Sequence, residues 1–136
     1  MRAREIMTNE TRCVGEGQTL SEAAQLMRDL DVGALPICGD DNRLKGMLTD
    51  RDIVLKCVAS GGDPSSTKAG DLAEGKPVTV GADDDIQVAL RTMTQHKVRR
   101  LPVIDGHDLV GMISQADIAR NLPEDQVGDL VEAISY

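Results

Sequence analysis

An internal duplication constrains the fold of this chain more than any other feature of its sequence. Seven residues recur 66 positions later, and five more recur 65 positions later once one residue is deleted in the loop after Cys38. The first members of these pairs are Val14, Gly15, Ala23, Met27, Val32, Leu35, Pro36, Leu44, Gly46, Met47, Asp52 and Ile53. A two-fold repeat of this length predicts two similar units packed face to face, not a long solenoid.

Each copy predicts the same β-α-β-β-α order from its hydrophobic periodicity and turn residues. In the first copy the elements are a strand at 12–14, a helix from the capping box Thr19–Glu22 to Gly33, strands at 34–38 and 44–48, and a helix bearing Ile53, Val54, Cys57 and Val58. In the second copy they are a strand at 77–80, a helix with its N-cap at Asp85, strands at 100–104 and 109–113, a helix bearing Ile118, and a last helix whose first turn holds Pro123.

These elements predict an α/β (α+β) fold with one domain at 1–66 and a second at 67–136. Each half alone would form a marginal core, so we expect the halves to share one. Pro36 and Pro102 fall inside predicted strands, which indicates a sheet edge or a strand start.

The composition limits the possible functions. The chain has a net charge of −8, which argues against generic nucleic-acid binding because that needs a basic surface. It also contains no Trp or Phe. A nucleotide base would have to rest on aliphatic side chains. No apolar run approaches the ~18 residues of a membrane span. The first residues lack a signal-peptide pattern, so we expect a cytoplasmic protein.

Polar chemistry is concentrated at two strand–helix junctions, one in each copy. Thr49-x-x-Asp52 and Ser114-x-x-Asp117 place a hydroxyl and a carboxylate beside free backbone N–H groups. One interpretation is a helix capping box with a first-turn carboxylate. The other is a site that holds a phosphorylated, ribose-containing ligand.

Two arginines make the copies unequal. Arg99 and Arg100 form either a solvated pair or the partner of a phosphate, because a guanidinium forks onto phosphate oxygens. The matching positions of the first copy hold Gly33 and Ala34. We therefore expect one site to be stronger, with Lys45, Arg51 and Lys56 as weaker cationic candidates.

Taken together, the repeated Leu-Pro-Ile/Val strand, the Gly-Met-Leu/Ile strand and the Thr/Ser-x-x-Asp turn resemble a tandem pair of CBS domains, the regulatory module named after cystathionine β-synthase. The resemblance covers nearly the whole chain. A pair without a catalytic domain is also similar to small actinobacterial CBS proteins induced by hypoxia and stress.

The resemblance implies a pseudo-two-fold pair of repeats with an AMP-, ADP- or ATP-like ligand in clefts between them. The hydroxyl would contact phosphate, and the aspartate would accept hydrogen bonds from the ribose. The implied ligand-binding residues are Thr49, Asp52, Ser114, Asp117, Arg99, Arg100, Met47 and Met112. A homodimer is also implied.

The resemblance further makes Cys13 and Cys38 neighbours, either as two buried thiols or as a disulfide. Their counterparts, Thr79 and Ile104, are not cysteines. A disulfide in a cytosolic protein would be unusual and would suggest redox sensing.

No catalytic or metal pattern is present in the sequence. His96 and His107 have no partners at metal-ligand or triad spacing. We therefore expect no enzyme, no required cofactor and no metal, but a non-enzymatic sensor module. The alternative is a ligand-free stress protein that responds to redox state or binds an unknown protein partner.

Overall fold

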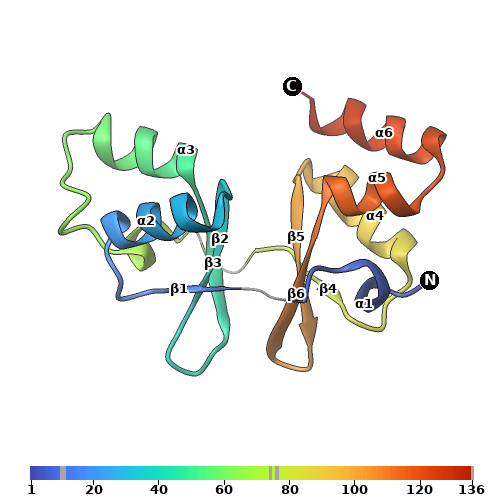
Figure 1. The fold of residues 1–136 in the computed structure, drawn as a ribbon, viewed down its shortest axis with the longest axis horizontal. Coiled ribbons are helices and arrows are strands. Elements are labelled where there is room, and N and C mark those ends of the chain that lie inside the picture. The colour runs from blue at the N-terminus through green and yellow to red at the C-terminus, as the bar shows by residue number, and fades with distance from the viewer. Residues whose placement is uncertain (10–11, 74, 76, 136) are drawn as a thin grey trace. The chain divides into compact units, whose positions relative to one another are not determined.

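The computed structural model describes residues 1–9, 12–73, 75 and 77–135. It divides into two compact units: unit 1 comprises Met1–Thr11 with Val78–Tyr136, and unit 2 comprises Arg12–Pro77. Each unit holds one three-stranded mixed sheet with helices (Figure 1). The predicted fold class with two β-α-β-β-α repeats is therefore confirmed. The boundary predicted between residues 66 and 67 follows the sequence duplication, whereas these units follow contacts.

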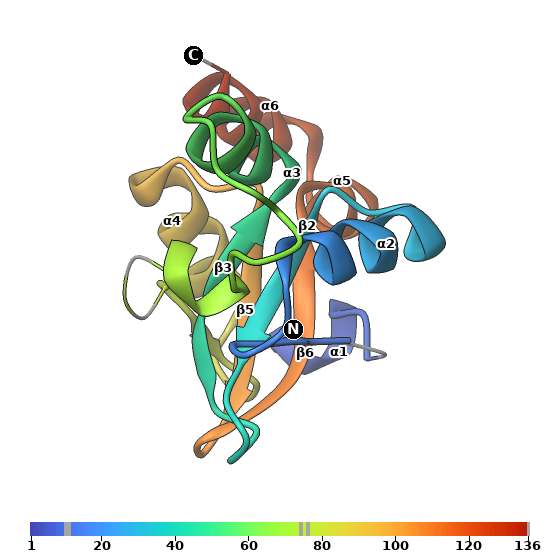
Figure 2. The same cartoon turned by 90° about the vertical axis from the view of Figure 1, so that its left-hand side faces the viewer.

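Unit 2 contains the first repeat. Its elements are β1 (Val14–Gly15), α2 (Leu20–Leu30), β2 (Ala34–Cys38), β3 (Leu44–Thr49), α3 (Asp50–Asp52), a π-helix (Ile53–Val58) and a 3-10 helix (Ala69–Leu72). The sheet order is β1-β2-β3, with β1 parallel and β3 antiparallel to β2. The β2–β3 hairpin projects away from α2 and α3 (Figures 1 and 2).

Unit 1 contains the second repeat together with the N-terminal segment. Its elements are α1 (Ala3–Ile6), β4 (Val80–Gly81), α4 (Ile86–His96), β5 (Arg100–Asp105), β6 (Asp108–Ser114), α5 (Gln115–Asn121) and α6 (Glu124–Ile134). The sheet order is β4-β5-β6, again with a parallel and then an antiparallel pair. Pro123 is the N-cap of α6 instead of a residue of its first turn.

The N-terminal segment packs in unit 1 through long-range contacts. Ala3 is fully buried in the unit-1 core. Thr8 forms a two-way backbone bridge with Met112, with N···O distances of 2.8 and 3.1 Å. The Arg4 guanidinium meets Asp83 at 2.8 Å and Asp105 at 3.2 Å. These contacts hold α1 beside β6.

The prolines correct one prediction, because Pro36 lies in the middle strand of its sheet and not in an edge strand. It pairs with Met47 of β3, while β1 pairs only with Ile37 and Cys38. The sheet is therefore two strands wide at Pro36, which leaves the proline nitrogen without a required partner. Pro102 occupies the same place in β5.

The predicted starts of α2 and α4 are correct, whereas the predicted end of α2 is wrong. Thr19 Oγ1 accepts from the Glu22 N–H at 3.1 Å, and Asp85 accepts from the Gln87 N–H at 2.9 Å. The helix α2 ends at Leu30, before the predicted end at Gly33, and Asp31 takes the left-handed conformation with φ 54°. Asp is one of the few residues besides Gly that tolerate this region.

The helix after β3 also differs from its predicted apolar face. It changes to a π-helix at Ile53, so its side chains do not follow the 3.6-residue period. Ile53 and Cys57 are buried, but Val54 and Val58 are each 54% exposed. The core of unit 2 therefore rests on β1, α2, β2, β3, the 3-10 helix and only part of this π-helical segment.

Candidate functional site

The unit-1 turn joins β6 to α5 through a capping box. Ser114 Oγ accepts from the Asp117 N–H at 3.2 Å, and the Ser114 N–H donates to Asp117 Oδ2 at 2.9 Å. The other carboxylate oxygen, Oδ1, lies 3.5 Å from Nη1 of Arg120. Asp117 is 8% exposed, and among the described residues it alone is both charged and buried. The turn therefore fixes a nearly buried carboxylate beside a hydroxyl.

The unit-2 turn repeats this geometry between β3 and α3. Thr49 Oγ1 accepts from the Asp52 N–H at 3.0 Å, and the Thr49 N–H donates to Asp52 Oδ2 at 3.0 Å. Asp52 Oδ1 lies 3.4 Å from Lys56 Nζ. The capping interpretation thus holds in both units. It does not exhaust the carboxylates, because an ionised carboxylate offers about four acceptor positions.

The structure brings the paired arginines to the unit-1 turn. Arg100 lies directly opposite Ser114 in the β5–β6 ladder, and the Arg99 carbonyl accepts from the Gln115 N–H at 2.9 Å. Both arginines are exposed, and neither guanidinium forms an ion pair or hydrogen bond within the described residues. Two arginines without a bound counter-charge among the described residues are therefore anchored beside the hydroxyl of the turn.

An apolar surface adjoins each turn on the same face of the sheet. Side chains two residues apart on a strand share a face, and residues directly opposite in an antiparallel pair do too. Met112 is thereby grouped with Ser114 and Arg100 in unit 1. Met47 is grouped with Thr49 in unit 2. Both methionines are half-buried, so an apolar group could rest on them while a polar end reaches the turn.

The strand glycines, by contrast, serve packing. A Cβ on Gly111 would meet Met7 Sδ at 2.6 Å and the Thr8 carbonyl oxygen at 2.8 Å. A Cβ on Gly46 would meet the Ala73 Cβ at 3.0 Å. Both glycines let a crossing segment approach the last strand of their sheet.

Unit 2 lacks the cations of unit 1 and carries an acid that we did not predict. Gly33 and Ala34 stand at the arginine positions, and Asp50 stands at the position of Gln115. Two of the weaker cationic candidates already form ion pairs: Lys45 Nζ lies 3.5 Å from Asp41, and Lys56 pairs with Asp52. Alignment of the two repeats exposes the Asp50–Gln115 difference, which was the signal available in the sequence.

A shallow cavity of about 360 Å³ also lies in unit 2. Its lining residues come from the end of α2 and from the helix after β3: Ala24, Met27, Arg28, Asp31, Val32, Asp50, Ile53 and Val54. The lining combines apolar side chains with three charged ones, Arg28, Asp31 and Asp50. Asp50 therefore borders open space instead of a packed core.

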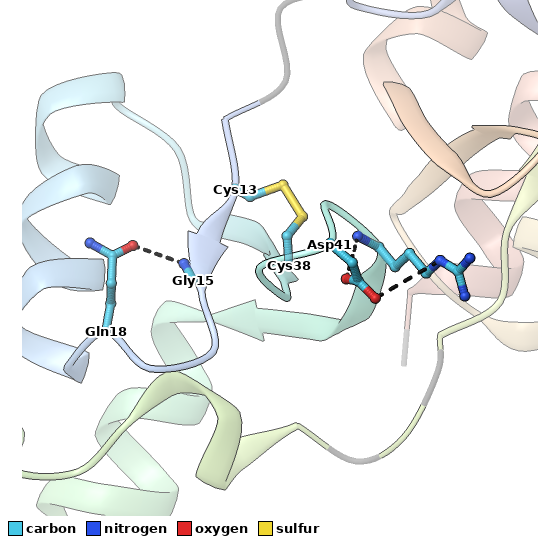
Figure 3. Close-up of a disulfide and its surroundings, with 6 residues drawn as sticks. Cys13, Gly15, Gln18, Cys38 and Asp41 are labelled. Carbon is cyan, nitrogen blue, oxygen red and sulfur yellow. Dashed lines mark hydrogen bonds and ion pairs between the residues drawn. A yellow bond between two sulfur atoms is a disulfide. The ribbon is translucent and has the colours of Figure 1, made fainter.

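Cys13 and Cys38 are joined by a disulfide across the start of β1 and the end of β2, with a Cα–Cα distance of 5.7 Å (Figure 3). The Gly15 N–H beside it donates to the Gln18 side chain at 2.8 Å. Asp41 lies in the following hairpin, where the Arg43 N–H donates to it and lowers its pKa. Cys57 is a free, buried thiol.

Within residues 1–9, 12–73, 75 and 77–135, no group of three or more His, Cys, Asp or Glu side chains is placed to hold a metal ion. His96 ends α4, and His107 lies in the β5–β6 hairpin. Within the same ranges, the helices are too short or too polar to cross a bilayer.

Comparison with known proteins agrees with this architecture. Residues 3–58 and 69–124 each match the CBS domain. The chain is 55% identical to Hypoxic response protein 1 of Mycobacterium tuberculosis over 132 residues, which is 97% of this chain and 92% of that protein. It is 36% identical to a CBS domain-containing protein of Bacillus subtilis, over 98% of this chain and 94% of that protein.

Two solved structures are informative about ligands. The crystal structure of Hypoxic Response Protein I with two coordinated zinc ions matches with a TM-score of 0.84 and 56% identity, over 90% of this chain and all of that chain. A CBS domain protein from Pyrobaculum aerophilum complexed with AMP matches with a TM-score of 0.80 and 25% identity, over 97% and 99% of the two chains.

Proposed function

Because the chain belongs to the CBS domain family, we propose that it is a non-enzymatic sensor that binds an adenosine nucleotide, such as AMP, at its strand–helix turns. The unit-1 turn is the stronger site in this proposal. Its support is the convergence of Arg99, Arg100, Ser114 and Asp117 at one end of β6. An AMP complex of a relative with 25% identity supports the ligand class.

Each group of the unit-1 turn suits one part of a nucleotide. The guanidinium groups of Arg99 and Arg100 match phosphate oxygens as bidentate donors. Oδ2 of Asp117 already accepts from the N–H and the hydroxyl of Ser114, so acceptor capacity for ribose hydroxyls remains on Oδ1. Met112 offers an apolar, polarisable surface for the base in a chain without Trp or Phe. Phosphate binding to a chain of net charge −8 needs such local cations.

Zinc has no part in this proposal. The zinc ions of the Hypoxic Response Protein I crystal structure are a property of that protein. In this chain the described residues do not supply a cluster that fits a metal ion, so no residue is assigned to one.

A second candidate function is a redox-responsive module, and the Cys13–Cys38 disulfide favours it. In that case reduction would change the stability or partners of unit 2 without any nucleotide. The two candidates are separable because the disulfide lies in unit 2, whereas the arginine pair lies in unit 1.

Calorimetric titration tests the nucleotide proposal. Charge-assisted contacts contribute about 1.5–3 kcal/mol, so Arg99→Ala with Arg100→Ala should weaken AMP binding about tenfold to a hundredfold. Adenosine, which has no phosphate, should bind the variant and the parent equally. Arg12→Ala with Arg43→Ala removes the same net charge from unit 2 and is the matched control. Equal losses of AMP and adenosine, or an equal loss in the control, would show that these arginines do not hold the phosphate.

A further inference from the structure

The two turns have opposite charge at their phosphate end, and this difference predicts different ligands. We propose that Asp50 makes the unit-2 turn reject anionic ligands, so that it accepts an uncharged nucleoside such as adenosine while the unit-1 turn takes the nucleotide. This inference rests on the proposed function and adds a specificity-determining residue to it. The difference lies in side chains at equivalent positions of the repeat.

The equivalence is set by backbone hydrogen bonds and strand register. The Asp50 N–H donates to the Gly33 carbonyl at 3.0 Å, just as the Gln115 N–H donates to the Arg99 carbonyl at 2.9 Å. Ala34 lies opposite Thr49 in the β2–β3 ladder. Arg100 lies opposite Ser114 in the β5–β6 ladder. Differences in side chain, rather than in backbone, therefore distinguish the two turns.

The Asp50 carboxylate occupies the space where an arginine side chain begins in unit 1. Its Oδ2 lies 3.1 Å from the position that a Cβ on Gly33 would take. Its Oδ1 accepts from the Arg51 N–H at 2.8 Å, which fixes the carboxylate orientation. A phosphate placed in unit 2 as Arg99 would place it in unit 1 would therefore meet a carboxylate.

The remaining charges do not reverse this difference. Lys56 beside Asp52 has a counterpart in Arg120 beside Asp117, at 3.4 and 3.5 Å. Arg51 follows Asp50, but successive helical positions diverge by about 100°, so its side chain leaves in another direction. Like charges at close range oppose binding, and Asp50 is exposed, so an anion that approaches the turn meets its charge.

The part of the turn that suits a nucleoside is retained in unit 2. The hydroxyl-to-amide and amide-to-carboxylate distances at Thr49 and Asp52 are both 3.0 Å, close to those at Ser114 and Asp117. Met47 takes the place of Met112 on the same face of the strand. The selectivity therefore acts on the phosphate alone.

A reciprocal exchange tests this inference. Asp50→Gln gives unit 2 the residue of unit 1, and Gln115→Asp gives unit 1 the residue of unit 2. Asp50→Glu keeps the charge and is the matched control. Each chain is titrated with AMP and with adenosine by calorimetry, and circular dichroism checks that the variants fold like the parent.

The parent should bind one AMP and two adenosine molecules per chain. Asp50→Gln should gain a second AMP site, Asp50→Glu should not, and Gln115→Asp should weaken AMP at least tenfold with adenosine unchanged. Unchanged AMP stoichiometry in Asp50→Gln, with AMP binding intact in the parent, overturns the inference alone. If no chain binds either compound, the proposed function fails and the inference fails with it.

Discussion

Reduction of the Cys13–Cys38 disulfide should destabilise unit 2 by about 3.5 kcal/mol. The cysteines are 25 residues apart. On the chain-entropy model, closing a loop of that length costs the unfolded chain about 12 cal/mol/K, which is ~3.5 kcal/mol at 25 °C. The folded unit should survive reduction. In unit 1 the same strand pairing forms with Thr79 and Ile104 in place of the cysteines.

The assay is urea unfolding followed by circular dichroism, with and without a dithiol reductant. At an m-value of about 2 kcal/mol/M, the unfolding midpoint of unit 2 should fall by about 1.8 M. Cys57→Ser should keep this sensitivity to reductant, and Cys13→Ser with Cys38→Ala should lose it. A midpoint that reductant leaves unchanged, or three titratable thiols in the air-equilibrated unfolded chain, would refute the reasoning.

Three further predictions concern packing, acid stability and assembly. Gly111→Ala should destabilise the fold by about 1–3 kcal/mol in the same denaturation assay, because the new Cβ would collide with Met7. Gly128→Ala, whose new Cβ meets nothing within 4 Å, should instead stabilise α6 by up to about 1 kcal/mol. Arg4 lowers the pKa of Asp83 below 3.8, so this ion pair stabilises the fold above pH 3.8, and its contribution is lost as the pH falls through the lowered pKa. Arg4→Met should therefore reduce the slope of melting temperature against pH in this acid range. An unchanged slope would contradict the assignment. Sedimentation at tens of micromolar should give a dimer mass, because exposed apolar side chains remain on the unit-2 helices, and a monomer mass would count against this.

Much of the fold could be predicted because its signals are local. The capping residues Thr19 and Asp85 and the hairpin strands depend on neighbours within a few residues, and the structure has them close to their predicted positions. The π-helix at Ile53 and the left-handed Asp31 carry no such local signal and were not predicted. The assignment of α1 to unit 1 likewise depends on a bridge between Thr8 and Met112, more than a hundred residues apart in sequence.

The candidate site could be predicted only in part. The hydroxyl–carboxylate pairs and the arginines are visible in the sequence as residue types at fixed spacing. Their proximity depends on register, since Arg100 lies beside Ser114 only because β5 and β6 pair in this alignment. Asp50 was missed because it lies inside the motif, where its neighbours Thr49 and Asp52 carried the interpretation.

A crystal structure of the chain grown with AMP tests the central proposal most directly. The proposal predicts electron density for AMP at the unit-1 turn, with its phosphate within hydrogen-bond distance of Arg99 or Arg100 and of Ser114, and with its ribose on Asp117. AMP ordered with its phosphate away from both arginines, or no bound AMP at millimolar concentration, would contradict it.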